Sequence, residues 1–409
     1  MTIWFAATCV YILAITGRTS FGVAGVAAMD RFQVDANALA VFTTLQIGVY
    51  AASQIPMGLA IDRFGPKKML LIGALIMGLG QILLGFAPSY GWALAARVPI
   101  GMGDATAFLS VLRIIPEWIP AKRAPVFLQF TTALGQFGQV LSAIPFFLVL
   151  QAPWGGWPQA FVGLGAVGII NAFAAGLLIS TSHTPPASGQ RMLTHLKANL
   201  RQVVRSRVVW QAFFVHWVGV APSAIFLLLW GAPLMKLGMG LAPADVAFAF
   251  SVQTFAGALA APVHGWISSR AGLRRGDVAV LAAGASLVLL LWFFATETPR
   301  GVAAVTFMLI VLAMLVPASS FGFDTVRERM PLPVLATATG LANMGGFTAT
   351  VIGSQALGWL LVQHNPAGTY SWPDFRFAWL AVGAVIVAGM AGYVVARAGE
   401  AGRRGAWAK

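Results

Sequence analysis

Two stretches of the sequence, GLAIDRFGPKK at residues 58–68 and GWISSRAGLRR at residues 265–275, follow the same pattern. In both, a glycine opens the stretch, an arginine and a second glycine follow at the same spacing, and two basic residues close it. The second copy begins 207 residues after the first, which is close to half of the 409-residue chain. A repeat at this distance predicts a chain built from two halves with the same internal arrangement.

The composition is typical of a membrane protein. Hydrophobic residues make up 58% of the chain, charged residues only 9%, and the mean hydropathy is +0.81. Soluble domains carry roughly 25% charged residues, so a cytosolic enzyme, a secreted domain and a disordered chain are excluded. The single cysteine, Cys9, excludes an internal disulfide and a cysteine-based zinc cluster, and we expect it to fill space in the first apolar run.

Twelve apolar runs, each about 19–27 residues long, follow one another along the chain. A helix of this length crosses a hydrocarbon core of roughly 30 Å, whereas membrane β-strands need about 10 residues in alternation. The first run lacks a basic leader and is longer than the core of a signal peptide, so we expect a retained helix. The runs cover residues 3–29, 38–60, 69–87, 91–115, 125–149, 158–180, 208–233, 243–267, 277–296, 302–323, 336–362 and 377–396.

These runs predict an all-α integral membrane protein with 12 transmembrane helices in two six-helix halves. The expected domains are an N-terminal bundle (1–180), a cytoplasmic linker (181–207), a C-terminal bundle (208–396) and a cytoplasmic tail (397–409). Within the linker, the stretch Arg191–Arg207 is typical of a basic amphipathic helix on the anionic inner leaflet. A binding site for a regulatory partner is the alternative interpretation of that helix.

Lysine and arginine set the orientation of the chain. With the N-terminus inside, 19 of the 26 basic residues fall in the inner connections and the C-terminal tail, and four fall in the outer connections. This positive-inside bias predicts that both termini are cytoplasmic. It also explains the net charge of +14 by contact with the lipid bilayer, without nucleic acid. The other three basic residues lie within spans and are Arg18, Arg97 and Arg113.

The repeated stretch has a chemistry suited to a reversible contact between helices. Gly58 lets two helices approach closely, Gly65 permits a tight turn, and the closing basic pair can anchor the stretch to the inner leaflet. Asp62 and Arg63 lie at the inner end of the second span, where an ion pair or a helix-end contact can hold a closed state. Ser269 replaces Asp62 in the second copy, so we expect a weaker contact there. We define the gating motif as Gly58, Asp62, Arg63, Gly65, Lys67, Lys68, Gly265, Arg270 and Gly272.

Six residues of the first copy resemble the signature loop between helices two and three of the major facilitator superfamily: Gly58, Asp62, Arg63, Gly65, Lys67 and Lys68. In the fourth span, Arg97, Gly101 and Gly103 are similar to the helix-four motif of that family. Twelve spans, a long middle connection and a weaker second copy of the loop are similar too. The resemblance implies secondary active transport by alternating access, with a substrate site between the halves near the membrane midplane.

Two further features resemble particular branches of that family. Arg18 in the first span resembles the organic-anion and organophosphate members, but these carry a second arginine in the seventh span, where this chain has His216. The run Asn343–Gly346 resembles the glycine-rich helices of nitrate-type members, although the two substrate arginines of that branch are not both evident. The resemblance therefore extends to the organic-anion and nitrate-type side of the family, and neither a phosphate ester nor nitrate is predicted as the substrate.

Ionisable residues at membrane depth cost several kcal/mol, so each should face a cavity or a partner. The fork of Arg18 suits a carboxylate or phosphate, which predicts an anion-binding residue; a structural pair with a buried acid is the alternative. Arg97 and Asp104 are seven residues apart, nearly two helical turns, and so share a face of the fourth span. Asp104 is then either a proton carrier or a fixed counter-ion of Arg18 or Arg97.

Other polar residues in the spans complete the candidate set. Arg113 is expected to be structural, paired with Glu117 or with Asp62. Neutral polar side chains near mid-depth are candidates as well, although a hydrogen bond between helices is their commoner role. A histidine in the seventh span could titrate near neutral pH, with a buried structural histidine as the alternative. The predicted substrate-binding residues are Arg18, Gln46, Tyr50, Arg97, Gln136, His216 and Asn343, with Asp104 as the proton-coupling candidate.

The predicted function is transport of a small, anionic organic solute across the inner or plasma membrane by alternating access, with H⁺ as the candidate coupling ion. The formal charges of Arg18, Arg97 and Asp104 sum to +1, which favours an anion. The alternative is a proton-driven exporter of drug-like molecules, which would require an exposed Asp104 and both arginines turned away. A receptor or membrane enzyme is a third alternative, but the sequence has no Walker-type loop and no HExxH motif, so we predict no enzyme, no cofactor and no metal. We expect a monomer.

Overall fold

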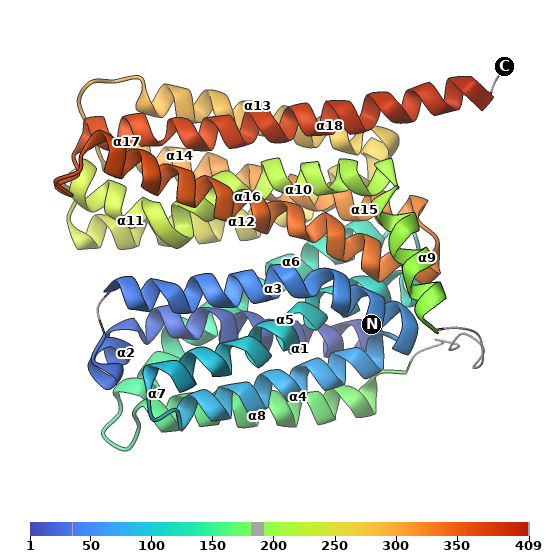
Figure 1. The fold of residues 1–409 in the computed structure, drawn as a ribbon, viewed down its shortest axis with the longest axis horizontal. Coiled ribbons are helices and arrows are strands. Elements are labelled where there is room, and N and C mark those ends of the chain that lie inside the picture. The colour runs from blue at the N-terminus through green and yellow to red at the C-terminus, as the bar shows by residue number, and fades with distance from the viewer. Residues whose placement is uncertain (35, 181–191, 408–409) are drawn as a thin grey trace. The chain divides into compact units, whose positions relative to one another are not determined.

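The computed structural model describes residues 1–34, 36–180 and 192–407, and within these residues the chain forms helices and no strand (Figure 1). The described residues form 12 long helices and contain 10 stretches that are long and apolar enough to cross a membrane. One of these stretches, Pro243–Phe294, contains two helices. The predicted all-α membrane fold is confirmed, while the cytoplasmic location of the termini stays a prediction.

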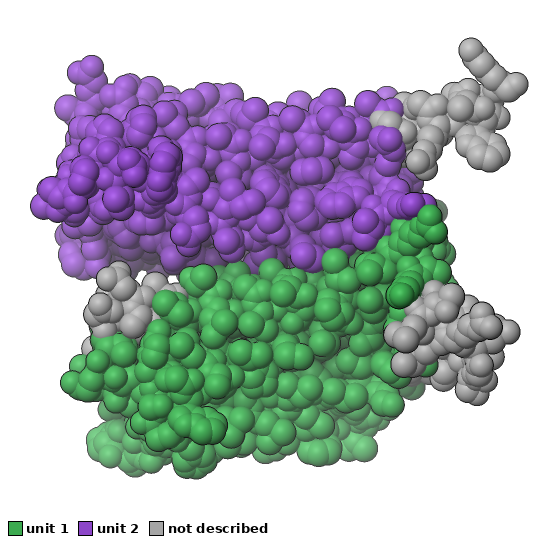
Figure 2. Space-filling view, in the orientation of Figure 1, with its two compact units in different colours: residues 1–203, 331–340 green, residues 204–330, 341–409 purple. Residues whose placement is uncertain are grey.

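The chain divides into two compact units (Figure 2). The first comprises Met1–Val203 and Pro331–Gly340, and the second comprises Val204–Met330 and Leu341–Lys409. The predicted linker, 181–207, includes this division, and its first part, 181–191, lies outside the described residues. The sequence did not indicate that residues 331–340 group with the first unit.

The helices of the first unit follow the apolar runs. Gly65 separates the second and third runs. Its φ of 87° is a conformation that glycine adopts without steric cost, and Pro66 then starts the next helix. The helices are α1 (Thr2–Val23), α2 (Gly25–Phe32), α3 (Ala36–Phe64), α4 (Pro66–Gly85), α5 (Tyr90–Trp118), α6 (Ala124–Leu141), η1 (Ser142–Phe146), α7 (Phe147–Gln151), α8 (Trp157–Leu178) and α9 (Met192–Val204).

The helices of the second unit include several short irregular turns. Pro222 lies near the end of α10 and donates no backbone hydrogen bond, and the chain continues as the π-helical turn η2. The elements are α10 (Arg207–Ile225), η2 (Phe226–Trp230), α11 (Gly231–Pro233), η3 (Leu234–Gly238), α12 (Pro243–Ala271), η4 (Gly272–Arg274), α13 (Arg275–Phe294), α14 (Val302–Leu315), η5 (Val316–Ser320), α15 (Phe321–Arg329), η6 (Leu332–Val334), α16 (Leu335–His364), α17 (Trp372–Ala378) and α18 (Leu380–Trp407).

Packing inside each unit leaves large apolar side chains on the outside. Leu177, Phe255 and Leu281 are 89%, 72% and 73% exposed, which is costly in water but favourable against lipid. Inside the first unit, a Cβ on Gly165 of α8 would lie 2.5 Å from the carbonyl oxygen of Gly78 in α4, so only glycine permits this approach. The buried interior of each unit can therefore hold polar groups away from lipid.

Candidate functional site

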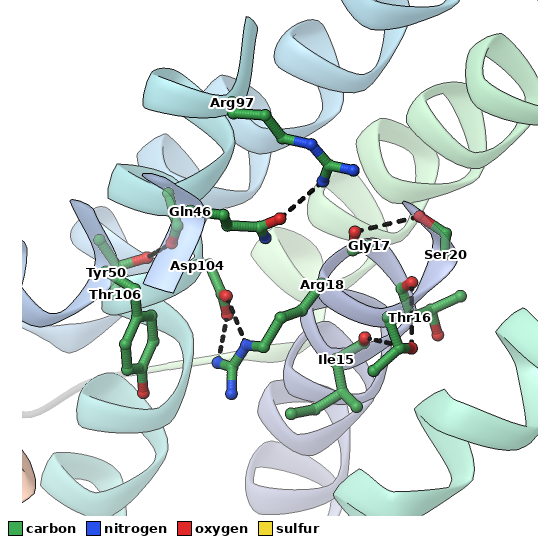
Figure 3. A network of polar contacts seen from close by, with 12 residues as sticks. Ile15, Thr16, Gly17, Arg18, Ser20, Gln46, Tyr50, Arg97, Asp104 and Thr106 are labelled. Atoms are coloured by element: carbon green, nitrogen blue, oxygen red, sulfur yellow. Dashed lines mark hydrogen bonds and ion pairs between the residues drawn. The ribbon is translucent and has the colours of Figure 1, made fainter. Parts of the chain in front are cut away.

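Arg18 of α1 and Asp104 of α5 form a two-pronged ion pair inside the first unit (Figure 3). Arg18 Nε donates to Asp104 Oδ2 and Arg18 Nη2 donates to Asp104 Oδ1, both at 2.8 Å. The side chain of Asp104 is fully buried, whereas that of Arg18 is 20% exposed. The parallel geometry is the strongest that an arginine and a carboxylate can adopt, and the arginine is the member that an incoming solute can reach.

Tyr50 of α3 covers the guanidinium of Arg18. The guanidinium carbon lies 4.3 Å from the centre of the Tyr50 ring, which is a cation–π contact. Tyr50 is itself 3% exposed, so the ring is held in place by its surroundings. Three of the predicted site residues, Arg18, Tyr50 and Asp104, thus meet at one point.

Arg97 lies elsewhere in the same polar network and has a different partner. Its Nη1 donates to Gln46 Oε1 at 2.6 Å, and its guanidinium carbon lies 4.2 Å from the centre of the Phe21 ring. Although Arg97 shares α5 with Asp104, both oxygens of Asp104 are bonded to Arg18. The two predicted arginines therefore do not compete for Asp104 in this structure.

Arg97 and Gln46 leave three buried donors without an acceptor among the described residues. These are Nε and Nη2 of Arg97 and Nε2 of Gln46. Arg97 is fully buried and Gln46 is 3% exposed. A buried donor left unsatisfied costs about 1–3 kcal/mol, and more when it is charged. A group rich in acceptors, such as a carboxylate, would satisfy them.

The other predicted binding residues have contacts with other groups. Gln136 of α6 accepts a hydrogen bond from Gln139 Nε2 at 2.5 Å, within its own helix. In the second unit, His216 of α10 lies with its Nδ1 3.4 Å from the carbonyl oxygen of Ser319 and its ring 4.8 Å from that of Phe323. Asn343 of α16 is 2% exposed. The roles proposed for these three residues stay predictions.

The gating motif in α3 contacts the start of α16 within the first unit. Asp62 Oδ1 accepts a hydrogen bond from the backbone N–H of Ala336 at 2.8 Å. Asp62 Oδ2 accepts two from Thr337, from its N–H at 2.8 Å and its hydroxyl at 2.7 Å. A Cβ on Gly58 would lie 2.7 Å from Thr337 Cα, so glycine is required for this approach. Asp62 therefore caps the N-terminus of α16, where a negative charge is stabilised by the helix dipole.

A second acid and an arginine of α5 surround this cap. Arg113 Nη1 donates to Glu117 Oε1 at 2.6 Å, and Arg113 Nε lies 3.9 Å from Asp62 Oδ1. Both partners considered for Arg113 are therefore present at once. Arg63 and Lys68 instead lie over the ring of Phe64, at 5.4 Å and 5.5 Å.

In the second copy of the repeated stretch, Ser268 makes the contact to another helix. Ser269, which aligns with Asp62, does not. Ser269 donates to the carbonyl oxygen of Trp266 in its own helix, while Ser268 donates to Asp324 Oδ2 at 2.6 Å. Arg270 lies 4.0 Å above the Trp266 ring, and Gly272 has a φ of 50°. The contact of this copy thus depends on Asp324, an acid supplied by another helix.

One expectation about charges in the second unit is wrong, and one buried acid was missed. Arg275, expected to reach the inner leaflet, is 4% exposed because its Nε donates to the carbonyl oxygen of Ser268 at 2.7 Å and its Nη1 to Glu328 at 2.5 Å. A second acid, Asp324, is fully buried like Asp104, and the sequence analysis did not select it. The repeat could have identified it, since the same offset of 207 residues relates Glu117 to Asp324.

Comparison with known proteins agrees with this arrangement of helices. The model of the Major Facilitator Superfamily matches residues 7–354. The probable sulfoacetate transporter of Cupriavidus necator is 26% identical over 383 residues, covering 89% of this chain and 87% of that protein. The probable galactarate/D-glucarate transporter of Escherichia coli K12 is 21% identical over 378 residues, covering 84% of each.

A solved structure shows the same fold across the whole length. The bacterial homologue of the iron transporter ferroportin, in an outward-facing state, superposes with a TM-score of 0.76 at 15% identity, covering 97% of this chain and 99% of that one. The chain belongs to the Major Facilitator Superfamily. It is a transporter of that family and a multi-pass protein of the inner or plasma membrane, as the sequence predicts.

Proposed function

We propose that the protein carries a small organic anion bearing at least one carboxylate, and that Arg18 binds this carboxylate. The observation that supports the proposal is the two-pronged pair of Arg18 with Asp104, in which the arginine is 20% exposed and the acid is fully buried. A carboxylate of the solute presents the same two oxygens as Asp104 and can take its place on the guanidinium. The proposal is also supported by similarity to relatives named for sulfoacetate and for galactarate and glucarate.

Asp104 couples this binding to a proton in the proposed mechanism. While Asp104 is ionised it accepts hydrogen bonds from Nε and Nη2 of Arg18 and competes with the solute for that edge of the guanidinium. When Asp104 takes a proton, its attraction for the guanidinium falls and Arg18 becomes available to the anion. Solute and proton then enter together, because an ionised and unpaired Asp104 in a buried site is unfavourable.

Arg97 and Gln46 supply further positive potential and donors to the same unit. With Asp104 ionised, Arg18, Arg97 and Asp104 carry a net charge of +1, and the network still has three donors without a described acceptor. This surplus favours an anion over a cationic drug. The exporter alternative requires an exposed Asp104 and arginines turned away, but Asp104 is fully buried and Arg18 is the exposed member of their pair.

Uptake into vesicles tests the proposal. Purified protein in proteoliposomes is given radiolabelled carboxylates, among them sulfoacetate and glucarate, with an inward proton gradient and then with none. We expect gradient-driven accumulation of at least one carboxylate by the native protein. Gradient-driven uptake is expected to be absent in Asp104→Asn, which keeps solute exchange. If a panel of organic cations is moved and no carboxylate is, the proposal is wrong.

A further inference from the structure

The amide of Gln81 in α4 makes one hydrogen bond within the described residues, and it reaches the backbone of α1. Gln81 Nε2 donates to the main-chain carbonyl oxygen of Gly17 at 3.3 Å, and Gln81 is 2% exposed. The opposite orientation of the amide would set its oxygen against that carbonyl oxygen, so the nitrogen is the donor. Gly17 comes directly before Arg18, the proposed anion-binding residue. Two helices are therefore linked one residue away from the proposed site.

The stability of the protein does not explain a glutamine at position 81. The other polar atom of the amide, Gln81 Oε1, is buried and has no partner among the described residues. A buried acceptor without a partner costs more free energy than one ordinary hydrogen bond returns. Methionine has a similar size and no amide, so it would fill the same space without an unpaired acceptor. The hydrogen bond to Gly17 is therefore the feature that sets glutamine apart at this position.

Gly17 makes room for the amide of Gln81. A Cβ at Gly17 would lie 2.6 Å from Gln81 Nε2, so any other residue would displace the amide. Glycine is less favourable than alanine inside a helix, which makes this close approach costly to α1 itself. The same carbonyl oxygen also accepts the hydroxyl of Ser20 at 3.1 Å, a bond within α1 (Figure 3). Of these two side chains, Gln81 is the one that comes from another helix.

The residue before Asp104 also packs against α4. A Cβ at Gly103 of α5 would lie 2.4 Å from the carbonyl oxygen of Gly73 in α4, so the two backbones are in close contact. Gly103 precedes Asp104 as Gly17 precedes Arg18. Both members of the ion pair thus follow a glycine that contacts α4. Contacts with this one helix can keep the two parallel hydrogen bonds of the pair at 2.8 Å each.

We infer that Gln81 is a positioning residue, which holds α1 on α4 so that the fork of Arg18 meets a carboxylate in the two-pronged geometry. This inference rests on the proposed function, because Gln81 acts through Arg18. In Gln81→Met the charge of Arg18 stays, but its guanidinium is no longer held in line with the two carboxylate oxygens. We expect the affinity for the solute to fall about twofold to tenfold at acidic pH, the range of one ordinary hydrogen bond. The Tm should be unchanged or higher, because the unpaired acceptor is gone.

A double-mutant cycle tests whether Gln81 acts through Arg18. Calorimetric titration with sulfoacetate and with glucarate compares the full-length native protein, Gln81→Met, Arg18→Lys and the double variant. Lysine has no fork to orient, so Gln81→Met should cause little further loss of affinity in the Arg18→Lys protein. The loss in Gln81→Met alone should also shrink as the pH rises, because a misplaced Arg18 then pairs less well with Asp104 too. Additive losses, or a loss that is equal at every pH, would overturn the inference.

Two variants of α1 complete the test. Gly17→Ala displaces the amide of Gln81 while it favours the helix, so it should reproduce the loss of affinity without a lower Tm. Ser20→Ala is the matched control, because it removes the other donor to the same carbonyl oxygen but no link to α4, and its affinity should stay native. If Gln81→Met and Gly17→Ala bind as the native protein does while Arg18→Lys binds weakly, the inference is overturned and the proposed function stands. If Arg18→Lys also binds as the native protein does, the proposed role of Arg18 fails and the inference fails with it.

Discussion

Replacing Arg18 with lysine separates an anion-binding arginine from a structural one. Lysine keeps the positive charge but has no planar fork, so a carboxylate bound to it loses one of its two parallel hydrogen bonds. A charge-assisted hydrogen bond contributes about 1.5–3 kcal/mol, which corresponds to about 10- to 100-fold in affinity. This full loss of solute affinity should be measured only when Asp104 is protonated and no longer pairs with Arg18.

The same substitution affects the free protein at higher pH. When Asp104 is ionised, Arg18 makes two hydrogen bonds to it in the absence of solute, both at 2.8 Å. At this pH, Arg18→Lys weakens both the pair with Asp104, which competes with the solute, and the contact with the solute carboxylate. The two effects on the measured affinity therefore partly cancel. We therefore expect the affinity ratio of native to Arg18→Lys protein to be about 10–100 at acidic pH and to fall towards 1 as pH rises.

Calorimetric titration of a transported carboxylate across a pH series measures this ratio. Arg31→Lys is the matched control, because Arg31 is exposed and donates to the carbonyl oxygen of Ala87 away from the network. Its ratio should stay near 1 at every pH. An Arg18→Lys protein that binds as tightly as the native one at acidic pH would refute the reasoning and identify Arg18 as a structural partner of Asp104.

Three further substitutions test other parts of the structure. In Asp62→Asn, the cap of α16 loses its charge and one of its two acceptor oxygens, which lowers the stability of the cap by about 0.5–2 kcal/mol. Transport in vesicles should slow while solute affinity stays within about twofold. Native transport rates in this variant would contradict the prediction. In Gly58→Val, the added side chain meets Thr337 Cα, so the same transport defect should appear with a lower Tm, whereas Gly91→Val, with open space around it, should change neither. Arg97→Gln removes a fully buried cation that contacts no carboxylate of the described residues; we expect unchanged or higher Tm but weaker solute binding, and unchanged binding would show that Arg97 does not contribute.

Much of the fold could be predicted from the sequence because the lipid environment restricts the possibilities. Backbone groups in a bilayer must be satisfied internally, so long apolar runs can only be helices. The turn at Gly65 and Pro66 and the close approach at Gly58 follow from residue type alone. Depth along a helix also identified Arg18, Arg97 and Asp104 as residues that need a partner.

The choice of partners could not be predicted in this way. Sequence spacing placed Asp104 and Arg97 on one face of α5, but spacing along a helix says nothing about which side chain approaches from another helix. The structure pairs Asp104 with Arg18 of α1 and leaves Arg97 to Gln46 of α3. Arg275 was misassigned for the same reason, because its burial depends on Glu328, which is 53 residues away in the chain.

The sequence by itself determined the helical membrane fold, the internal repeat and the presence of costly charges within the spans. Only the tertiary structure decided which charges neutralise each other, which donors are left for a ligand, and that Asp62 caps the start of α16. The physical reason is the range of the interactions. Hydrophobicity and backbone hydrogen bonding act along a continuous segment and are legible in the sequence, whereas an ion pair forms over about 3 Å between helices whose packing depends on the whole unit.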